Sequence, residues 1–393
     1  MILQLNIWSL ITAYYSEKEE IMNNQVIGRK RDIPPYRYDI VGSFLRPEEI
    51  RLARRQYEKK EISKEELKEV EDIEIAKLVK KQKKIGLRAV TDGEFRRGWW
   101  HLDFFLGIKG TERIKINQGS NSYNKLMKAE TFRVIDNIKF ENHPMIDHFK
   151  YLKGITEGCI PKFSIPSPAL FHFVESYNSN RFYKDNEKFL CDIIDVYKHA
   201  IKAFYDAGCR YLQLDDTTWG TLCSEIHRSR YVELGVDPDE LAKDYVRLIN
   251  ESISCCPKDM TIVLHICRGN FHSMWFAAGG YEPVSKELFS NTKVDAFFLE
   301  YDNERSGDFS PLRFVKDQIV VLGLVTTKHG GLESKEELKA RIFEACKYVD
   351  IDKLCLSPQC GFASTEEGNL ITEEEQWAKL ELIVETAKEI WIQ

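Results

Sequence analysis

The chain has 393 residues, 43% of them hydrophobic and 30% charged, and it is long enough to bury a large core. Its formal net charge of -6 at pH 7 provides no basic field for a polyanion, which argues against nucleic acid and favours a small-molecule partner. The ten cysteines fall at irregular spacings, as is typical of thiols in the reducing cytoplasm rather than of a disulfide framework.

The first 35 residues precede any clear secondary-structure pattern. Residues 1–15 are apolar, but they lack a basic leading segment and a small-residue cleavage site, and they are too short to span a membrane. We therefore expect residues 1–35 to form a disordered extension and residues 36–393 to form one domain with no membrane association.

From residue 38 onward, short apolar runs alternate with longer amphipathic runs, a pattern typical of parallel strands connected by helices. Ser63 with Glu66 forms a helix-starting capping box, and Gly86 and Gly208 are placed to end helices just before strands. The strand candidates are residues 39–44, 89–94, 162–166, 211–216, 261–267, 296–301, 319–325 and 354–359. Eight such units predict an α/β fold, a single (β/α)8 TIM-type barrel with its chemistry at the carboxyl ends of the strands.

Two long segments interrupt this pattern. Residues 107–141 are polar and predict a hairpin or an irregular insertion after the second strand. Residues 166–186 predict a long loop after the third strand. We expect both insertions to rise on the catalytic face and to shape access to it.

A candidate metal site lies at three strand ends. His265 and Cys267 end the fifth strand candidate, where alternate side chains point to one face about 6 to 7 Å apart. Cys360 follows the last strand, and Glu300 ends the sixth. Each residue alone is as readily a core residue, but together at one rim they predict a zinc site with a coordination position left for substrate.

The ligand types indicate the chemistry. Two thiolates donate charge to zinc and weaken the electrophilicity that metal hydrolases need, but such a soft site accepts a substrate thiol and lowers its pKa from about 8.5. Alkyl transfer to sulfur is the reaction that this site predicts. Other strand ends carry Glu94, Asp215 and Asp216, which would suit the ammonium group of an amino-acid thiol, although each alone could be a solvated turn or a salt bridge.

Six segments, in the same order along the chain, resemble the catalytic C-terminal barrel of the cobalamin-independent methionine synthase family. They are VGSFLRP at 41–47, DGEFRR at 92–97, LQLDD at 212–216, HIC at 265–267, Glu300 and PQCG at 358–361. The resemblance extends from about residue 36 to the end of the chain. It implies a methyltransferase that transfers a methyl group to homocysteine and forms methionine.

The resemblance also implies roles for individual residues. The zinc (Zn2+) ligands would be His265, Cys267 and Cys360, with Glu300 as the ligand that an incoming thiol displaces. The residues that bind the amino and carboxylate groups of homocysteine would be Ser43, Glu94 and Asp215. The resemblance places His329 near the family's proton-handling histidine, and either His329 or Asp216, from the end of the fourth strand, is our candidate for the proton donor to the leaving group.

The methyl donor and some rival functions stay open at this point. Methyl-folate is the donor that the family implies, but full-length members carry a second barrel that helps to hold it, so a methyl-corrinoid protein or another small donor is an alternative. Trp99, Trp100, His101 and Phe105 predict either a stacking surface for the donor or a packed lid. Rival functions are a thiol alkyltransferase with a coenzyme M-like acceptor, a cofactor-free decarboxylase and a non-catalytic zinc-binding barrel. A homodimer is compatible with all of them.

Overall fold

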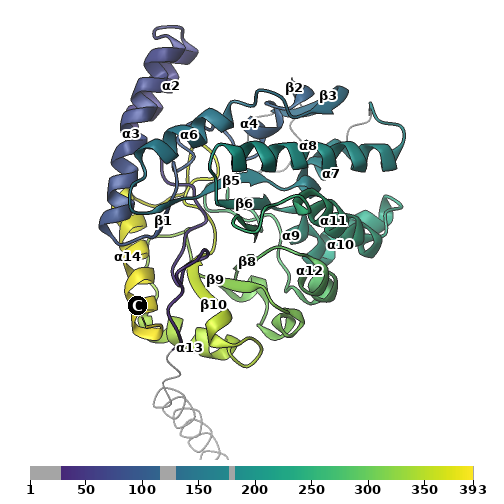
Figure 1. The fold of residues 1–393 in the computed structure, drawn as a ribbon. Coiled ribbons are helices and arrows are strands. Elements are labelled where there is room, and N and C mark those ends of the chain that lie inside the picture. The colour runs from purple at the N-terminus through teal and green to yellow at the C-terminus, as the bar shows by residue number, and fades with distance from the viewer. Residues whose placement is uncertain (1–27, 116–129, 177–181, 393) are drawn as a thin grey trace, which may run out of the picture.

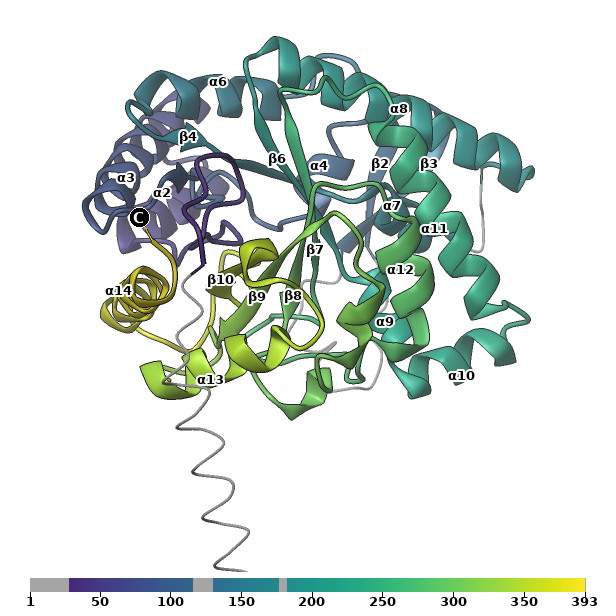
Figure 2. The same cartoon turned by 60° about the horizontal axis from the view of Figure 1, so that its bottom comes forward.

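The computed structural model describes residues 28–115, 130–176 and 182–392, with helices arranged around a central set of strands (Figures 1 and 2). Six parallel strands form the main sheet, in the order β10-β9-β8-β7-β6-β5. Their bounds are β5 (Phe163–Pro166), β6 (Tyr211–Asp216), β7 (Thr261–Ile266), β8 (Ala296–Glu300), β9 (Ile319–Val325) and β10 (Leu354–Pro358). Nearly all of their residues are buried, as expected for parallel strands covered on both faces.

The parallel pairing continues beyond the six-stranded sheet. β1 (Ala89–Val90) pairs with β4 (Ile160–Pro161), which leads into β5. Gly93, which follows β1 in the chain, forms a parallel bridge with Ser43. Tyr38 forms a parallel bridge with Leu356 of β10. The segment around residues 38–43 therefore connects β10 to the β1 side, and the strands close into the predicted barrel.

The prediction of a continuous strand over residues 39–44 is wrong. The structure forms only isolated bridges there, at Tyr38 and Ser43. Between them Gly42 has a φ of +142°, and the Asp39 side chain accepts a hydrogen bond from the Ile40 amide at 2.8 Å. Both features interrupt the regular alternation of a strand.

Side chains inside the barrel form a small core separate from the one under the helices. This inner cluster contains Tyr36, Val41, Ala89, Tyr211, Val263, Ala296, Phe298, Ile319, Val321 and Cys355. Successive side chains of a strand point to opposite faces, so the residues two positions beyond Val263 and Phe298 continue the inner row. These residues are His265 and Glu300. The barrel therefore aims both predicted ligands inward at the carboxyl end.

The helices pack outside the strands, and α2 and α3 project beyond the barrel (Figure 1). The α-helices are α2 (Glu48–Glu58), α3 (Lys64–Lys84), α4 (Leu102–Phe105), α6 (Met145–Ile155), α7 (Pro168–Ser176), α8 (Asn186–Asp206), α9 (Thr218–Cys223), α10 (Glu225–Glu233), α11 (Pro238–Ile253), α12 (Ser285–Asn291), α13 (Lys335–Ala345) and α14 (Glu373–Ile390). Short 3-10 turns are η1 (Glu282–Val284), η2 (Glu304–Ser306), η3 (Ser310–Phe314) and η4 (Ile351–Lys353). The capping box predicted at Ser63 and Glu66 is confirmed at the start of α3.

The two predicted insertions have different outcomes. β2 (Lys109–Lys115) and β3 (Glu130–Lys139) form an antiparallel hairpin, which confirms the first. The second prediction, a loop over residues 166–186, is wrong because α7 occupies much of it. Ser167 accepts a hydrogen bond from the Leu170 amide at 3.2 Å, and Pro168 suits the first helical position, so the segment starts a helix.

The described chain begins at Gly28, whose amide donates to the Ile390 carbonyl at 3.2 Å. Arg29 forms an ion pair with Asp352 at 2.7 Å. The prediction of disorder over residues 1–35 therefore does not hold for residues 28–35, which pack against the barrel, and residues 1–27 lie outside the described ranges. None of the helices in those ranges has the length and apolar character needed to cross a membrane.

Candidate metal centre and substrate cavity

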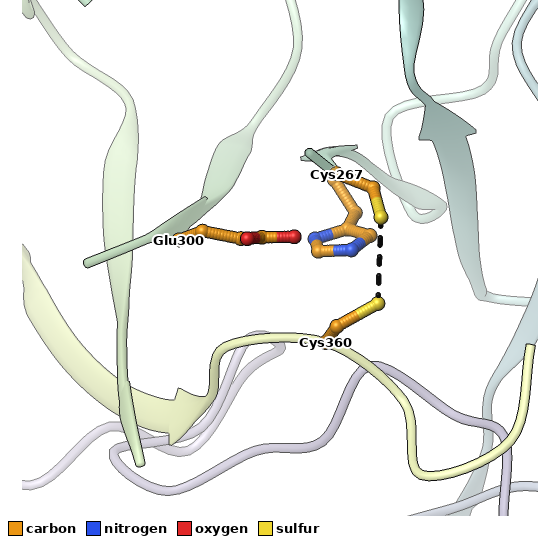
Figure 3. A group of neighbouring side chains, drawn as sticks. Cys267, Glu300 and Cys360 are labelled. Carbon is orange, nitrogen blue, oxygen red and sulfur yellow. Dashed lines mark hydrogen bonds between the residues drawn. The ribbon is translucent and has the colours of Figure 1, made fainter. Parts of the chain in front are cut away.

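Four buried side chains converge at the carboxyl ends of three strands. One ligand atom each from His265, Cys267, Glu300 and Cys360 lies within 4.8 Å of all the others. Figure 3 shows Cys267, Glu300 and Cys360 pointing toward one another from separate segments. The structure thus brings together the whole predicted ligand set, from β7, β8 and the turn after β10.

The imidazole of His265 is oriented for metal binding. Its Nδ1 lies 3.3 Å from the Phe298 carbonyl oxygen, which can only accept a hydrogen bond, so Nδ1 carries the proton. The other nitrogen, Nε2, is buried and has no hydrogen-bond partner among the described residues. A buried imidazole that is held through Nδ1 and presents Nε2 to two thiols is the arrangement of a metal-binding histidine.

The two cysteines form a close sulfur pair, with Sγ atoms 3.5 Å apart (Figure 3). A hydrogen bond from the Cys267 thiol, together with the neighbouring His265 ring, holds the pKa of Cys360 well below its usual value, and the same contact raises the pKa of Cys267. The Gly269 amide also donates to the Cys267 sulfur at 3.3 Å. The pair therefore holds one thiolate readily, and a bound metal ion would displace the second proton.

Glu300 is fully buried and held by two donors. Its Oε1 accepts from the Arg268 amide at 2.9 Å, and its Oε2 accepts from the Arg305 guanidinium at 2.5 Å. Asp302 binds the same guanidinium at 2.9 Å. Because these donors satisfy the carboxylate without a metal, Glu300 is suited to be an exchangeable ligand.

A cavity of about 310 Å³ opens beside the ligand group. Its lining residues are Val41, Ser43, Glu94, Trp99, Trp100, His101, Asp215, Thr217, His265, Cys267, Gly269, Asn270, Phe271, Phe276, Cys360, Gly361, Ser364 and Thr365. Among these described residues there are two carboxylates and neither lysine nor arginine. The lining therefore offers negative charge and aromatic surface near the ligands, and it fits a small cationic or zwitterionic molecule.

The two carboxylates are buried within the cavity wall. Glu94 accepts from the Ser164 hydroxyl at 3.0 Å through Oε1, whereas its Oε2 is buried without a hydrogen-bond partner in the described part of the chain. Burial raises the pKa of Glu94, although Arg97 lies 3.7 Å away. Burial likewise raises the pKa of Asp215 to about 7. Both groups would gain from a cation in the cavity.

Glu94 also has an unusual backbone conformation. It has a φ of +59° directly after Gly93 at +66°, in the left-handed region that residues with side chains seldom occupy. Its amide donates to the Asp92 carboxylate at 2.9 Å, which stabilises the turn. A strained residue held in this way is typical of functional sites, and the turn fixes where the Glu94 side chain enters the cavity.

Ser43 lies where two strand ends meet the Cys360 turn. Its carbonyl accepts from the Phe362 amide at 3.0 Å, and its hydroxyl accepts from the Ala363 amide at 3.3 Å. A Cβ atom added to Gly361 would lie 1.9 Å from the Ser43 hydroxyl oxygen. Close packing of Gly361 on Ser43 thus sets the position of the ligand that precedes it, Cys360.

The aromatic residues predicted as a stacking surface divide into two groups. Trp99, Trp100 and His101 line the cavity, whereas Phe105 lies in the hydrophobic core. Trp99 stacks against Phe271 with ring centroids 6.4 Å apart. The sequence analysis missed Phe271 and Phe276, because both lie in the loop after β7, where no periodic pattern identifies them.

The two residues predicted to transfer a proton lie outside the cavity lining. Asp216 is fully buried, and its carboxylate accepts from the Ser167 hydroxyl and from the Thr218 amide, which starts α9. His329 is exposed in the loop after β9. Its neighbour Lys328 is buried, and the Lys328 ammonium donates to the Asn270 side chain at 3.0 Å. The structure therefore does not bring Asp216 or His329 to the ligand group.

A family model described as "Cobalamin-independent synthase, Catalytic domain" matches residues 39–141 and 176–389. This match covers most of the chain and includes all four candidate ligands. The chain belongs to the cobalamin-independent methionine synthase family. It is accordingly a methyltransferase of this family, as the sequence motifs predicted.

Several relatives extend the comparison. The chain is 47% identical to "Uncharacterized protein YxjG" of Bacillus subtilis over 364 residues, which covers 92% of this chain and 96% of the relative. It is 24% identical to the methionine synthase of Pyrococcus furiosus over 335 residues, covering 84% and 87% of the two chains. This chain therefore has relatives of similar length in Bacillus subtilis and in Pyrococcus furiosus.

Solved structures in the same family share the fold. The putative vitamin-B12 independent methionine synthase of Listeria monocytogenes is 41% identical, with a TM-score of 0.75, and the match covers 92% of this chain and all of that one. A B12-independent methionine synthase from Shewanella sp. W3-18-1, in complex with selenomethionine, has a TM-score of 0.67 at 19% identity and covers 90% and 97% of the two chains. The second comparison supports the fold alone.

Proposed function

We propose that this enzyme transfers a methyl group to the thiol of homocysteine in a zinc-dependent reaction that forms methionine, with a methyl-folate as the donor. One observation carries the proposal. Two thiols and an imidazole, which form one group with the Glu300 carboxylate, line a cavity whose wall also holds two buried carboxylates. The first group can hold a metal ion that binds the sulfur of the substrate. The two wall carboxylates can bind the ammonium group of an amino acid.

The residues present fit zinc. His265 offers a buried nitrogen without a hydrogen-bond partner among the described residues, and Cys267 and Cys360 offer a close pair of sulfur atoms. Nitrogen and sulfur donors of this kind bind zinc in preference to harder cations. Glu300 would complete the set. Zinc held there supplies a Lewis acid that keeps an acceptor thiol ionised at neutral pH.

The acceptor proposed for the cavity is an amino acid. The buried Oε2 of Glu94 lacks a partner among the described residues, and Asp215 lines the same cavity, so an ammonium group would satisfy both carboxylates. A sulfonated thiol such as a coenzyme M-like acceptor needs a cationic partner, and none of the lining residues is lysine or arginine. The cavity thus favours homocysteine over that rival.

The Shewanella relative supports the same product class. Its structure is described as a complex with selenomethionine, the selenium analogue of methionine. We carry that ligand to this chain as a proposal, because the two chains share the fold and because Ser43, Glu94 and Asp215 lie together beside the sulfur ligands here. Ser43 would contact the carboxylate end of the amino acid.

The donor is proposed to lie against the aromatic side of the cavity. Trp99, Trp100 and Phe271 present flat surfaces there, which suit a planar heteroaromatic molecule such as a methyl-folate. In-line transfer requires the donor methyl to lie beyond the acceptor sulfur, on the open side of the ligand group. Proton transfer by Asp216 or His329 stays a prediction that their positions do not support.

A labelled-methyl assay tests the proposal. Zinc-loaded enzyme, homocysteine and 13C-methyl-tetrahydrofolate should give 13C-methionine, and chelation of the metal should stop the reaction. The Cys360→Ser variant should lose zinc and activity together. The control is Cys355→Ser, which should retain both. Cys355 is another buried cysteine, but it lies within β10, in the core cluster inside the barrel.

Each alternative has its own result in this assay. Transfer from methylcobalamin but not from the folate would replace the donor and keep the acceptor. Full activity of Cys360→Ser, or of the metal-free enzyme, would refute the proposed zinc chemistry. Zinc binding without any methyl transfer from several donors would favour the non-catalytic barrel.

A further inference from the structure

Lys328 is a buried cation close to the candidate metal centre. Only 7% of its surface is exposed, and its ammonium donates to the Gly269 carbonyl at 3.2 Å and to the Asn270 Oδ1 at 3.0 Å. In the part of the chain that the structure describes, Lys328 forms no salt bridge with a carboxylate. A buried ammonium with only neutral partners is unfavourable unless negative charge lies nearby.

The cysteine pair can supply that negative charge once its thiols are ionised. The two neutral partners of Lys328, in the Gly269–Asn270 turn, connect it to both cysteines. The Gly269 amide donates to the Cys267 sulfur at 3.3 Å, and the Asn270 side-chain amide donates to the Gly361 carbonyl, next to Cys360, at 2.6 Å.

Further buried polar groups complete this network. The Asn369 amide donates to the Asn270 Oδ1 at 2.9 Å and to the Thr327 carbonyl at 2.9 Å. The Thr327 hydroxyl donates to the same Gly361 carbonyl at 3.0 Å. Through these contacts, Lys328 connects the loops that follow β7, β9 and β10, which carry or adjoin the two sulfur ligands.

Charge balance gives the lysine a second role. Two thiolates and Glu300 carry three negative charges against the two positive charges of zinc, and Arg305 does not offset the whole excess because it pairs with both Glu300 and Asp302. A bound substrate thiolate adds another negative charge. A fixed ammonium beside the cysteines offsets it in a site where solvent screening is weak.

We propose that Lys328 is a positioning residue of the metal site, which holds the Gly269–Asn270 turn against the Cys360 turn and balances the charge of the sulfur ligands when the acceptor thiolate binds. This inference rests on the proposed function. It concerns a residue that the sequence motifs do not include, and it assigns a purpose to a cation buried without a carboxylate partner.

The test uses zinc-loaded enzyme with Lys328→Met and Lys328→Arg, and Lys379→Met as the control. Lys379 is another buried lysine, but its ammonium pairs with Glu333 at 3.1 Å outside the cavity. Three quantities are measured: the rate of zinc release to a chelator, the Kd for homocysteine, and the thiolate-to-metal absorption band of cobalt-substituted protein. Circular dichroism confirms that each variant is folded.

We expect Lys328→Met to release zinc about tenfold faster and to bind homocysteine about tenfold more weakly, as is typical when an outer partner of metal ligands is lost. The cobalt band should shift, and Lys328→Arg should restore much of the loss because it keeps the charge. Should Lys328→Met not fold, Lys328→Gln keeps polar groups toward Gly269 and Asn270 without the charge and answers the same question.

The outcomes separate the two proposals. Wild-type zinc release and homocysteine affinity in folded Lys328→Met or Lys328→Gln would overturn the role of Lys328 and leave the proposed function intact. Equal losses in Lys379→Met would also overturn it, because burial alone would then explain the effect. An unaltered protein that holds no zinc or binds no homocysteine would overturn the proposed function, and the role of Lys328 with it.

Discussion

The sulfur atoms of Cys267 and Cys360 lie 3.5 Å apart although 93 positions separate the two residues in the chain. Barrel closure produces this contact, because the two cysteines follow strands that end at the same rim. Neither sulfur would be near the other in a partly formed barrel. The candidate metal site therefore depends on the complete fold, and we expect changes that weaken strand closure to weaken metal binding too.

Removal of either cavity carboxylate should reduce discrimination for an amino-acid acceptor. Glu94→Gln or Asp215→Asn removes a buried charge that would face the homocysteine ammonium, so we expect the kcat/KM for homocysteine to fall at least about tenfold. The analogue without the amino group should lose much less. The measurement is the ratio of kcat/KM values for the two thiols, with Glu48→Gln as an exposed control. An unchanged ratio in both cavity variants would contradict the assignment.

Gly361→Ala should damage the site through packing. The added Cβ would lie 1.9 Å from the Ser43 hydroxyl oxygen and 3.3 Å from its backbone nitrogen, so the Cys360 turn or Ser43 must move. We expect loss of most activity and weaker zinc retention. Gly154→Ala is the matched control, because nothing lies within 4 Å of its added Cβ, and its zinc content should stay at the wild-type level. Metal analysis of purified protein checks both.

The pair formed by Asp39 and Lys162 should be important for stability. Both side chains are fully buried and 3.2 Å apart, and Asp39 also accepts from the Tyr211 hydroxyl at 2.9 Å. Asp39→Ala would leave the Lys162 ammonium buried without its partner, which costs about 3 to 5 kcal/mol. Urea unfolding measures the change. The control Lys202→Ala breaks an exposed pair and should have little effect, and a similarly small effect of Asp39→Ala would refute the prediction.

His143 should make the protein less stable in acid. Its Nε2 lies 2.9 Å from the Phe104 carbonyl and its Nδ1 accepts from the Met145 amide, so the fold requires the neutral ring. Burial lowers the pKa of His143 to about 4, below the ordinary value of 6.5 that applies in the unfolded chain. The unfolded state thus binds more protons between these values, and the stabilising effect present above pH 6.5 is lost as the pH falls toward 4.

For a shift of this size, one histidine contributes about 2 kcal/mol of stability lost between pH 7.5 and pH 5. Urea unfolding at the two pH values measures the loss. His143→Gln should be less stable than wild type at pH 7.5 but should lose less on acidification. If both proteins lose the same free energy, proton uptake by His143 does not explain acid sensitivity.

The positions of the four candidate metal ligands could be predicted from the sequence because each one lies at the end of an apolar run. Parallel strands in a barrel align their carboxyl ends, so His265, Cys267, Glu300 and Cys360 had to lie on one rim once eight strands were recognised. The same reasoning located Glu94 and Asp215. Local pattern and topology were sufficient for these residues.

Other features depend on contacts that no local pattern encodes. Lys328 donates hydrogen bonds to residues of the loop after β7, and the segment at residues 39–44 has a strand-like composition although Gly42 and the Asp39 side chain interrupt it. His329 was predicted as a site residue only from the resemblance, which placed it near the family's proton-handling histidine. The structure turns it to solvent and buries Lys328 instead.

Zinc-edge X-ray absorption, recorded with and without homocysteine, would reveal both the metal ligands and the binding of the acceptor thiol. The proposed zinc chemistry predicts about one zinc per chain bound through two sulfurs, one nitrogen and one oxygen, with a third sulfur replacing the oxygen when homocysteine is added. A zinc shell that does not change at saturating homocysteine, or a protein that binds no zinc, would contradict it.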